Sequence, residues 1–262
     1  MKLNFSKYQG AGNDFIIIKN TPLEKIDNSQ IKKICNRHFG IGADGLIVIN
    51  EHSKADYEMI YFNSDGNIGS MCGNGARCGF RYAIDEKIIQ SEKAEFLAFD
   101  GMHTARIQHD ANVEVSMADV ANWSFLGNTL VIDTGSPHFV KSVSNLFEID
   151  IKKEGQSIRY SKQFITEGIN VNFTEQVSDK IYMRTYERGV EDETLACGTG
   201  TVAVALFHRF TNGNPATGLF DIRIKAVGGN LKVAGEFKEG VFKNIFLTGP
   251  VEKVFEGCIE IE

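Results

Sequence analysis

Short runs of β-branched and other apolar residues recur along the chain, and glycine or asparagine punctuates most of the gaps between them. Seven such runs predict strands, beginning at Phe15, Leu46, Glu58, Ala94, Asn112, Ile181 and Phe220. The punctuation at Asp65-Gly66, Asp100-Gly101 and Gly228-Gly229-Asn230 is typical of hairpin turns. The pattern therefore predicts a protein made mainly of strands.

Three segments predict helices. Residues 27–37 carry isoleucines near helical spacing behind a candidate cap at Asp27 or Asn28. The other two segments open alike, as MCGNGARCGFRYAI from Met71 and ACGTGTVAVALFHRF from Ala196. Many strands with one principal helix in each half indicate an α+β fold.

The two Cys-Gly-x-Gly segments suggest an internal duplication. Cys197 lies 125 residues after Cys72, close to half of the 262-residue chain. Each cysteine follows an extended segment and an acidic turn. We expect two similar halves, each with a cysteine at the mouth of a helix. The alternative is that the small residues permit close helix packing and the cysteines are inert core thiols.

Composition favours small-molecule chemistry. The chain carries 28 Lys and Arg against 34 Asp and Glu, a net charge of −6, and has no cluster of five or more basic residues. No apolar run approaches the ~18 residues of a membrane span, and the N-terminal segment lacks a signal-like run. We expect no nucleic-acid or membrane partner and a cytoplasmic location. Five cysteines, an odd number, favour reduced thiols over a disulfide framework.

No metal site is expected. Cys72 and Cys78 are six residues apart, which on a helix separates them by ~120° around the axis, so they cannot share one tetrahedral ion. The six histidines show no ligand-like spacing. We expect Cys35, Cys78 and Cys258 to be ordinary buried or half-buried thiols.

A thiol at a helix N-terminus is suited to proton transfer. The partial positive charge there lowers a thiol pKa from about 8.5 into a range of about 3.5–7.5. If two such thiols face each other across a cleft, one thiolate removes a proton from a carbon while the opposite thiol supplies one to the other face. This inverts a stereocentre with no redox change and no cofactor.

Nearby polar residues match the needs of an amino-acid ligand. Glu187-Arg188 offers a carboxylate for an ammonium and a guanidinium for a carboxylate. Four asparagines next to glycines or strand ends are further candidates, although such residues often serve turns: Asn13, Asn63, Asn74 and Asn170. His138 is a candidate too, with a core histidine as the alternative.

Motifs throughout the chain resemble the diaminopimelate epimerase family. They are GAGNDFIII from Gly10, RHFGIGADGLIVI from Arg37, FNSDGNIGSMCGNGARC from Phe62, DTGSPHFV from Asp133, INVNF from Ile169, YERGVEDETLACGTGT from Tyr186, VGGNL from Val227 and LTGPVEKVFEG from Leu247. The resemblance implies cofactor-independent, two-base interconversion of LL- and meso-2,6-diaminopimelate, a step of lysine and peptidoglycan precursor synthesis.

The resemblance also implies residue roles. Cys72 and Cys197 are the catalytic bases, and Glu187 and His138 assist at the reacting end of the substrate. Substrate is bound by Asn13, Asn63, Ser136, Asn170, Glu187 and Arg188, and backbone amides are presented by Gly73, Asn74, Gly198 and Thr199.

The family architecture is two pseudo-symmetric domains, each a curved, mainly antiparallel sheet around a central helix, often in a homodimer. We expect residues 1–117 with 252–262 to form one half and 118–251 the other, with the strand near Glu256–Ile261 returning to the first.

The chain departs from the family pattern at three places. Ser136 stands where asparagine is common, and Gly45 stands where some members carry a polar side chain that contacts substrate. The segment around residues 189–193 is one residue longer than usual, which predicts a bulged loop.

Other functions remain as alternatives. Proline and hydroxyproline racemases use similar two-thiol chemistry, but they usually carry histidine where Asn74 stands and lack a Glu-Arg-Gly before the second cysteine. A non-enzymatic amino-acid binding protein, or a redox sensor using a Cys72–Cys197 disulfide, belongs to a different class. Exchange of the substrate α-hydrogen in deuterated water discriminates among these possibilities.

Overall fold

The structure is a computed structural model that describes residues 2–20, 26–211 and 213–261. The chain divides into two units, Met1–Val115 with Gly249–Glu262, and Ser116–Thr248. None of the helices within the described ranges has the length and apolar character that a membrane span requires.

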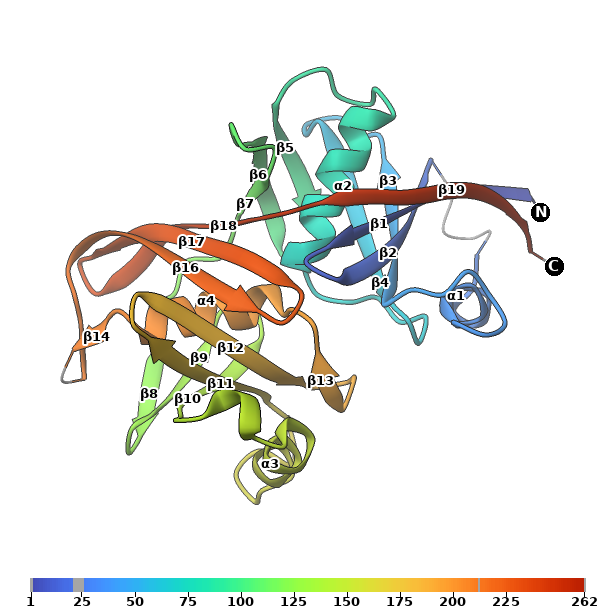
Figure 1. Ribbon diagram of the computed structural model, residues 1–262. Coiled ribbons are helices and arrows are strands. Elements are labelled where there is room, and N and C mark those ends of the chain that lie inside the picture. The colour runs from blue at the N-terminus through green and yellow to red at the C-terminus, as the bar shows by residue number, and fades with distance from the viewer. Residues whose placement is uncertain (1, 21–25, 212, 262) are drawn as a thin grey trace. The chain divides into compact units, whose positions relative to one another are not determined.

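The first unit is a mixed sheet wrapped around one helix (Figure 1). Its strands pair in the order β19-β1-β2-β3-β4-β5-β6-β7, with β2–β3 and β4–β5 parallel and the other pairs antiparallel. The strands are β1 (Lys2–Gly10), β2 (Asn13–Lys19), β3 (Gly45–Asn50), β4 (Tyr57–Asn63), β5 (Lys93–Ala98), β6 (Gly101–Ile107), β7 (Val113–Ser116) and β19 (Glu252–Glu260). The last strand, β19, pairs with the first, β1.

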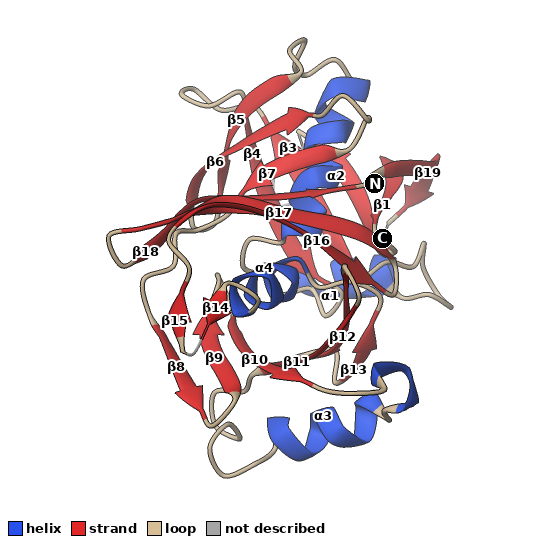
Figure 2. Cartoon of the chain, turned by 60° about the vertical axis from the view of Figure 1, so that its left-hand side comes forward, coloured by secondary structure: helices blue, strands red, loops and turns tan. Residues whose placement is uncertain are grey.

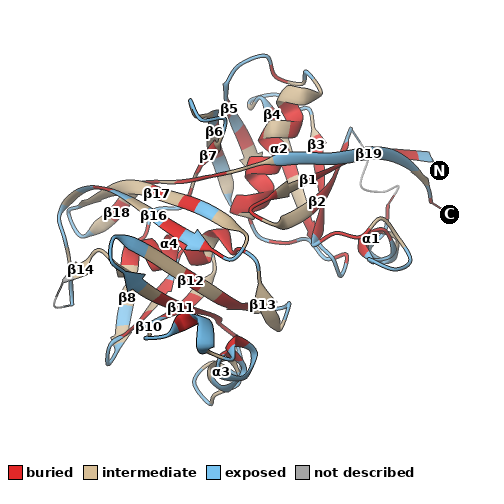
Figure 3. Cartoon of the chain, viewed as in Figure 1, coloured by how far each residue is buried: buried red, intermediate tan, exposed pale blue. Residues whose placement is uncertain are grey.

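Helix α2 (Gly73–Asp85) packs against this sheet, and most of its residues are buried (Figure 3). Its glycines allow a close approach to β3 and β4, because a Cβ at Gly79 would lie 3.3 Å from Ile49 Cδ1 on β3 and from Met59 Sδ on β4. Each glycine costs a helix roughly 1 kcal/mol relative to alanine, which the close packing offsets. A smaller helix, α1 (Asn28–Cys35), is capped by Asp27, one of the two predicted cap residues, and the Asp27 carboxylate forms a capping box with Gln30.

The second unit encloses α4 (Gly198–Phe207) within its strands (Figure 2). The strand order is β8-β9-β10-β11-β12-β16-β17-β18, with β10–β11 and β12–β16 parallel and β13 added to β12. The strands are β8 (Trp123–Leu126), β9 (Thr129–Asp133), β10 (Pro137–Ser142), β11 (Asn170–Val177), β12 (Lys180–Glu187), β13 (Asp192–Thr194), β16 (Gly218–Ala226), β17 (Gly229–Lys238) and β18 (Val241–Gly249), beside a small pair, β14 (Phe210–Thr211) and β15 (Asn214–Pro215).

The two units repeat one pattern of strand pairing. Taken in order from β19 in the first unit and from β8 in the second, the sequence of parallel and antiparallel pairs is the same. The α+β class and the two similar halves predicted from the sequence are therefore confirmed, and all seven predicted strands are present.

Two features differ from expectation. A further helix, α3 (Ile151–Arg159), follows a short 3-10 turn, η2 (Leu146–Glu148); it was not predicted because only Ile151 and Gly155 are buried, so its apolar signal is weak. Cys258 was expected to be at least half-buried and is exposed, because most of β19 faces solvent.

Candidate active site

Each cysteine of the repeated motif caps a helix. Cys72 and Cys197 have extended backbones, and their sulfurs accept hydrogen bonds from the amides of Gly75 at 3.4 Å and Gly200 at 3.3 Å. The sulfur takes the place that a serine oxygen occupies in an ordinary N-cap. Both sulfurs therefore lie at the positive end of a helix dipole, as the sequence predicted.

In the second unit a chain of hydrogen bonds leads from the sheet to the sulfur. Asn172 Nδ2 lies 3.0 Å from His138 Nδ1, His138 Nε2 lies 2.9 Å from Thr199 Oγ1, and Thr199 Oγ1 lies 3.5 Å from Cys197 Sγ. Strands β10 and β11 and the start of α4 each contribute to this chain. The structure thus brings together three of the predicted residues and adds Asn172.

This series of hydrogen bonds fixes the tautomer of His138. Asn172 Nδ2 also donates to the carbonyl of Phe139 at 3.1 Å, which can only accept, so the amide NH₂ faces the ring. Nδ1 therefore accepts, and in the neutral ring the proton lies on Nε2 and points at Thr199. Full burial, together with the charge of Arg188, lowers the pKa of His138 to about 3, so the ring is neutral near pH 7.

A glycine makes room for this arrangement. A Cβ at Gly200 would lie 2.5 Å from Asn172 Oδ1 and 3.2 Å from Cys197 Sγ. The carboxamide is held there by Thr185, whose hydroxyl lies 3.0 Å from the same oxygen. Because Gly200 has no side chain, the carboxamide of Asn172 can lie against the start of α4, close to Cys197.

Burial of neutral His138 predicts a loss of stability in acid. Below the ordinary histidine pKa of 6.5 the unfolded chain binds a proton that the folded chain refuses down to about pH 3, so stability falls as the pH falls through this window. The free energy of unfolding changes by about 1.4 kcal/mol per pH unit in this window, so it falls by roughly 2 kcal/mol between pH 7 and pH 5. We expect His138→Gln to weaken this pH dependence in urea unfolding at the two pH values. An unchanged dependence in the variant contradicts the assignment.

The second unit also holds the guanidinium of Arg188 in place, and its charge acts on His138. Asn170 Nδ2 donates to Ser136 Oγ at 3.0 Å and its Oδ1 accepts from the amide of Arg188 at 2.9 Å. The Arg188 side chain donates to the Glu167 carbonyl at 2.9 Å and reaches Ser136 Oγ at 3.5 Å. The hydroxyl of Ser136 thus joins Asn170 to Arg188.

Glu187 lies at the end of β12, where Thr194 Oγ1 donates to its Oε2 at 2.8 Å. The longer segment after it does not disrupt the hairpin: residues 188–191 close a turn in which the amide of Glu191 donates to the carbonyl of Glu187 at 2.8 Å. Glu191 has a φ of 58° and accepts from the hydroxyls of Tyr160 and Tyr186 at 2.9 Å each. These bonds hold Glu191 in place within the turn.

The first unit has its own polar group beside the sulfur. Cys72 Sγ lies 3.9 Å from Asn13 Oδ1, which also accepts from Asn74 Nδ2 at 3.2 Å. Asn13 Nδ2 donates to Asp44 at 2.6 Å, and Asp44 is bound by Arg37 at 2.7 Å. Three predicted residues are therefore in contact, and Asp44 is an addition that orients Asn13.

Asn63 is less closely tied to this group. It lies exposed at the end of β4, opposite Gly45 in the register, and no hydrogen bond joins its side chain to Cys72 or Asn13 among the described residues. Tyr61 explains the glycine at position 45, because a Cβ there would lie 2.4 Å from the Tyr61 ring. The ring occupies the space that a side chain at position 45 would need.

The matched topology shows how the halves differ. His138 and Asn170 are register partners on β10 and β11, as Phe15 and Gly45 are on β2 and β3. Correspondingly, Gly200 approaches Asn172 and Gly75 approaches Ile47. The second unit therefore places a histidine and an asparagine where the first places apolar side chains. The sequence signal for Asn172 was its position two residues after Asn170, on the same face of the strand.

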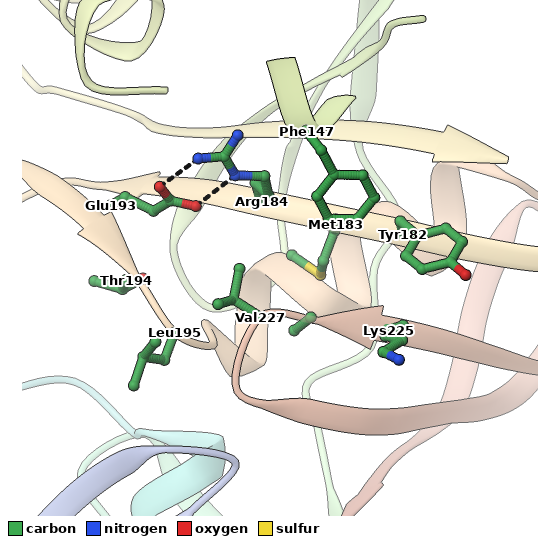
Figure 4. Close-up of a pocket in the computed structure, with 10 residues that line it drawn as sticks. Phe147, Tyr182, Met183, Arg184, Glu193, Thr194, Leu195, Lys225 and Val227 are labelled. Carbon is green, nitrogen blue, oxygen red and sulfur yellow. Dashed lines mark hydrogen bonds and ion pairs between the residues drawn. The ribbon is translucent and has the colours of Figure 1, made fainter. Parts of the chain in front are cut away.

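A separate cavity of about 530 Å³ lies in the second unit (Figure 4). Arg184 and Glu193 line it as an ion pair at 2.6 Å, beside Phe147, Leu195 and Val227. None of the predicted catalytic or binding residues lines it. Within the ranges that the structure describes, no group of three or more His, Cys, Asp or Glu residues is arranged to hold a metal ion.

Comparison with solved structures defines the class of fold. A Bacillus anthracis phenazine biosynthesis protein of the PhzF family superposes with a TM-score of 0.77 at 12% identity, covering all of both chains. A hydroxyproline epimerase from Agrobacterium vitis gives 0.68 at 12% identity over 98% of this chain and 92% of that one. The chain thus has the two-domain α+β fold of these proteins, and its likeness to the hydroxyproline enzyme is one of fold alone.

Sequence comparison then gives the family. The family model described as diaminopimelate epimerase matches residues 5–123 and 130–254. A diaminopimelate epimerase of Flavobacterium psychrophilum is 44% identical over 97% of this chain and 98% of its own, and one of Chlorobaculum tepidum is 40% identical over 96% and 99%. The chain belongs to the diaminopimelate epimerase family and is an isomerase.

Proposed function

We propose that the protein interconverts LL- and meso-2,6-diaminopimelate, in lysine and peptidoglycan precursor synthesis, with Cys72 and Cys197 as its two bases. The observation that carries this proposal is that two units of matched topology each place a cysteine sulfur at the N-terminus of a central helix. The choice of diaminopimelate as substrate rests on family membership. We also propose that it is a cytoplasmic homodimer, on the family resemblance.

The reaction moves two protons. One sulfur, as thiolate, takes the Cα proton, and the C–H electron pair moves into the adjacent carboxylate to give an enediolate. The other sulfur, as thiol, protonates Cα from the opposite face, and the pair returns to restore the carboxylate. The two sulfurs exchange protonation states, and nothing is oxidised or reduced.

The enediolate charge needs donors aimed at it. The backbone amides of Gly73, Asn74, Gly198 and Thr199 belong to the first turns of α2 and α4, where they lack helical acceptors. By analogy with oxyanion-hole deletions, each such donor is worth roughly 3–4 kcal/mol of transition-state stabilisation.

The remaining polar residues suit a zwitterionic ligand. Arg188, held by Glu167 and Ser136, offers its guanidinium to a carboxylate, and Glu187 offers a carboxylate to an ammonium group. Asn170 orients Arg188, while Asn13 and Asn63 supply amides from the first unit. His138 and Thr199 direct a hydrogen-bond donor toward Cys197 from behind.

Deuterium incorporation tests the proposed function. With either epimer in deuterated water, we expect label at Cα of the product before it appears in recovered substrate, because each thiol exchanges the proton that it holds itself. Mass spectrometry of the separated epimers at low conversion measures this order. Absence of label in diaminopimelate would refute the activity, and equal labelling of both epimers from the start would refute the two-base mechanism.

A further inference from the structure

Arg77, in the second turn of α2, is a buried cation without a carboxylate partner. Its side chain is 0% exposed, and none of the ion pairs of the described residues includes it. Nη2 donates to Asn74 Oδ1 at 2.9 Å and Nη1 to the carbonyl of Gly73 at 3.3 Å, while Nε has no partner. A buried charge is costly unless it is compensated, so this guanidinium requires explanation.

The negative charges that act on Arg77 are the thiolate forms of Cys78 and Cys72. Burial lowers the pKa of Arg77 to about 10, opposed by the charges of Cys78 and Cys72, so the side chain remains cationic near pH 7. Cys78 is a poor counter-ion, because full burial raises the pKa of its thiol well above the ordinary value. Cys72 is half-buried and its sulfur already accepts an amide hydrogen bond.

Other charges near α2 are accounted for. The helix packs against β1, β2, β3, β4 and β6. Most titratable groups on these strands have polar partners of their own: Lys7 pairs with Asp14, Tyr8 with Asp85, Lys19 with Glu86, Glu58 with Asn50, His103 with Asp100 and Arg106 with Glu114. The other titratable residues on these strands are Lys2, Tyr57 and Tyr61, and the Tyr57 hydroxyl is buried without a hydrogen-bond partner. The charge of Asp14 acts on Cys78, where it further disfavours the thiolate.

The second unit has no equivalent cation. Arg77 lies five residues after Cys72, and the residue five after Cys197 is Val202, which is fully buried among apolar side chains of α4. The fold of a unit therefore does not require a guanidinium at this place. The two half-sites therefore differ in the residue that lies five positions after the cysteine.

We propose that Arg77 is a positioning residue that favours the thiolate form of Cys72 and fixes the orientation of Asn74. The guanidinium binds the amide oxygen of Asn74, which turns the amide NH₂ toward Asn13 Oδ1, the atom that lies 3.9 Å from the Cys72 sulfur. The negative charge of the Cys72 thiolate compensates the buried guanidinium, and the guanidinium in turn favours the thiolate over the protonated thiol. The inference deepens the proposed function, since a thiolate at Cys72 is the base that one direction of the reaction uses.

Alkylation tests this without substrate. The rate of iodoacetamide modification at Cys72, followed by peptide mass spectrometry from pH 5 to 10, reports its thiolate fraction. We expect a midpoint below the ordinary value of about 8.5 in the unaltered protein. We expect Arg77→Met to raise the midpoint by at least about one unit, which slows modification about tenfold at a pH well below both midpoints. Arg77→Lys, which keeps the charge, should stay close to the unaltered protein.

Arg81→Met is the matched control, because Arg81 lies on the same helix one turn later and pairs with Asp85 at 2.9 Å. It should leave the midpoint unchanged. An Arg77→Met protein that keeps its circular dichroism and the original midpoint overturns the proposal. If that variant does not fold, a midpoint at or above 8.5 in the unaltered protein overturns it instead.

Because this titration needs no diaminopimelate, its failure and that of the proposed function are distinguishable. A shifted midpoint with no epimerisation refutes the function alone, and epimerisation with an unmoved midpoint refutes the role of Arg77.

Discussion

Replacement of either Cys72 or Cys197 by serine lowers epimerisation by at least about 10²–10⁴-fold in both directions, the range by which a positioned acid or base accelerates a reaction. Each sulfur acts as base in one direction and as acid in the other, so loss of one removes both. Serine preserves the cap, since its oxygen accepts the amides of Gly75 or Gly200 as sulfur does. The loss therefore reflects chemistry and not folding. Chiral separation of the epimers over time measures it.

Cys258→Ser is the control for cysteine removal, because Cys258 is exposed on β19 and lies outside the proposed chemistry. It should retain the turnover of the unaltered protein. Thermal unfolding of all three variants checks that the caps hold. Full turnover in both the Cys72 and the Cys197 variants would rule out the two-thiol mechanism.

Arg188→Met should have the next largest effect, on substrate binding. A charge-assisted hydrogen bond contributes about 1.5–3 kcal/mol, so loss of the guanidinium lowers kcat/KM by roughly 10–200-fold. The decrease should appear mainly as a higher KM, because the guanidinium binds a group that does not react. Initial-rate kinetics with both epimers measure the two parameters separately.

Arg223→Met is the matched control, since Arg223 is exposed on β16 and carries no proposed role. Its kinetics should equal those of the unaltered protein. An unchanged KM in Arg188→Met, with the hairpin of β12 and β13 intact by circular dichroism, would remove Arg188 from the binding site.

Much of the fold could be predicted from the sequence because its signals are local. The apolar runs bounded by Asp-Gly and Gly-Gly turns form strands at the expected places, and Asp27, one of the two predicted cap residues, caps helix α1. The repeated Cys-Gly-x-Gly placed each sulfur at a helix N-terminus, since a cap depends on a few neighbouring residues. Helix α3 was missed because it buries little apolar surface.

The sequence by itself therefore determined two similar halves, their strand-rich character and the two cysteine caps. The tertiary structure decided which polar residues lie behind each sulfur. Asn172, Thr185 and His138 come into contact only when β10, β11 and β12 pair. Arg77 becomes buried only when α2 packs on its sheet. Burial and long-range hydrogen bonding depend on elements far apart in the chain, so no local pattern reveals that His138 becomes a buried neutral ring or that Arg77 becomes a buried cation.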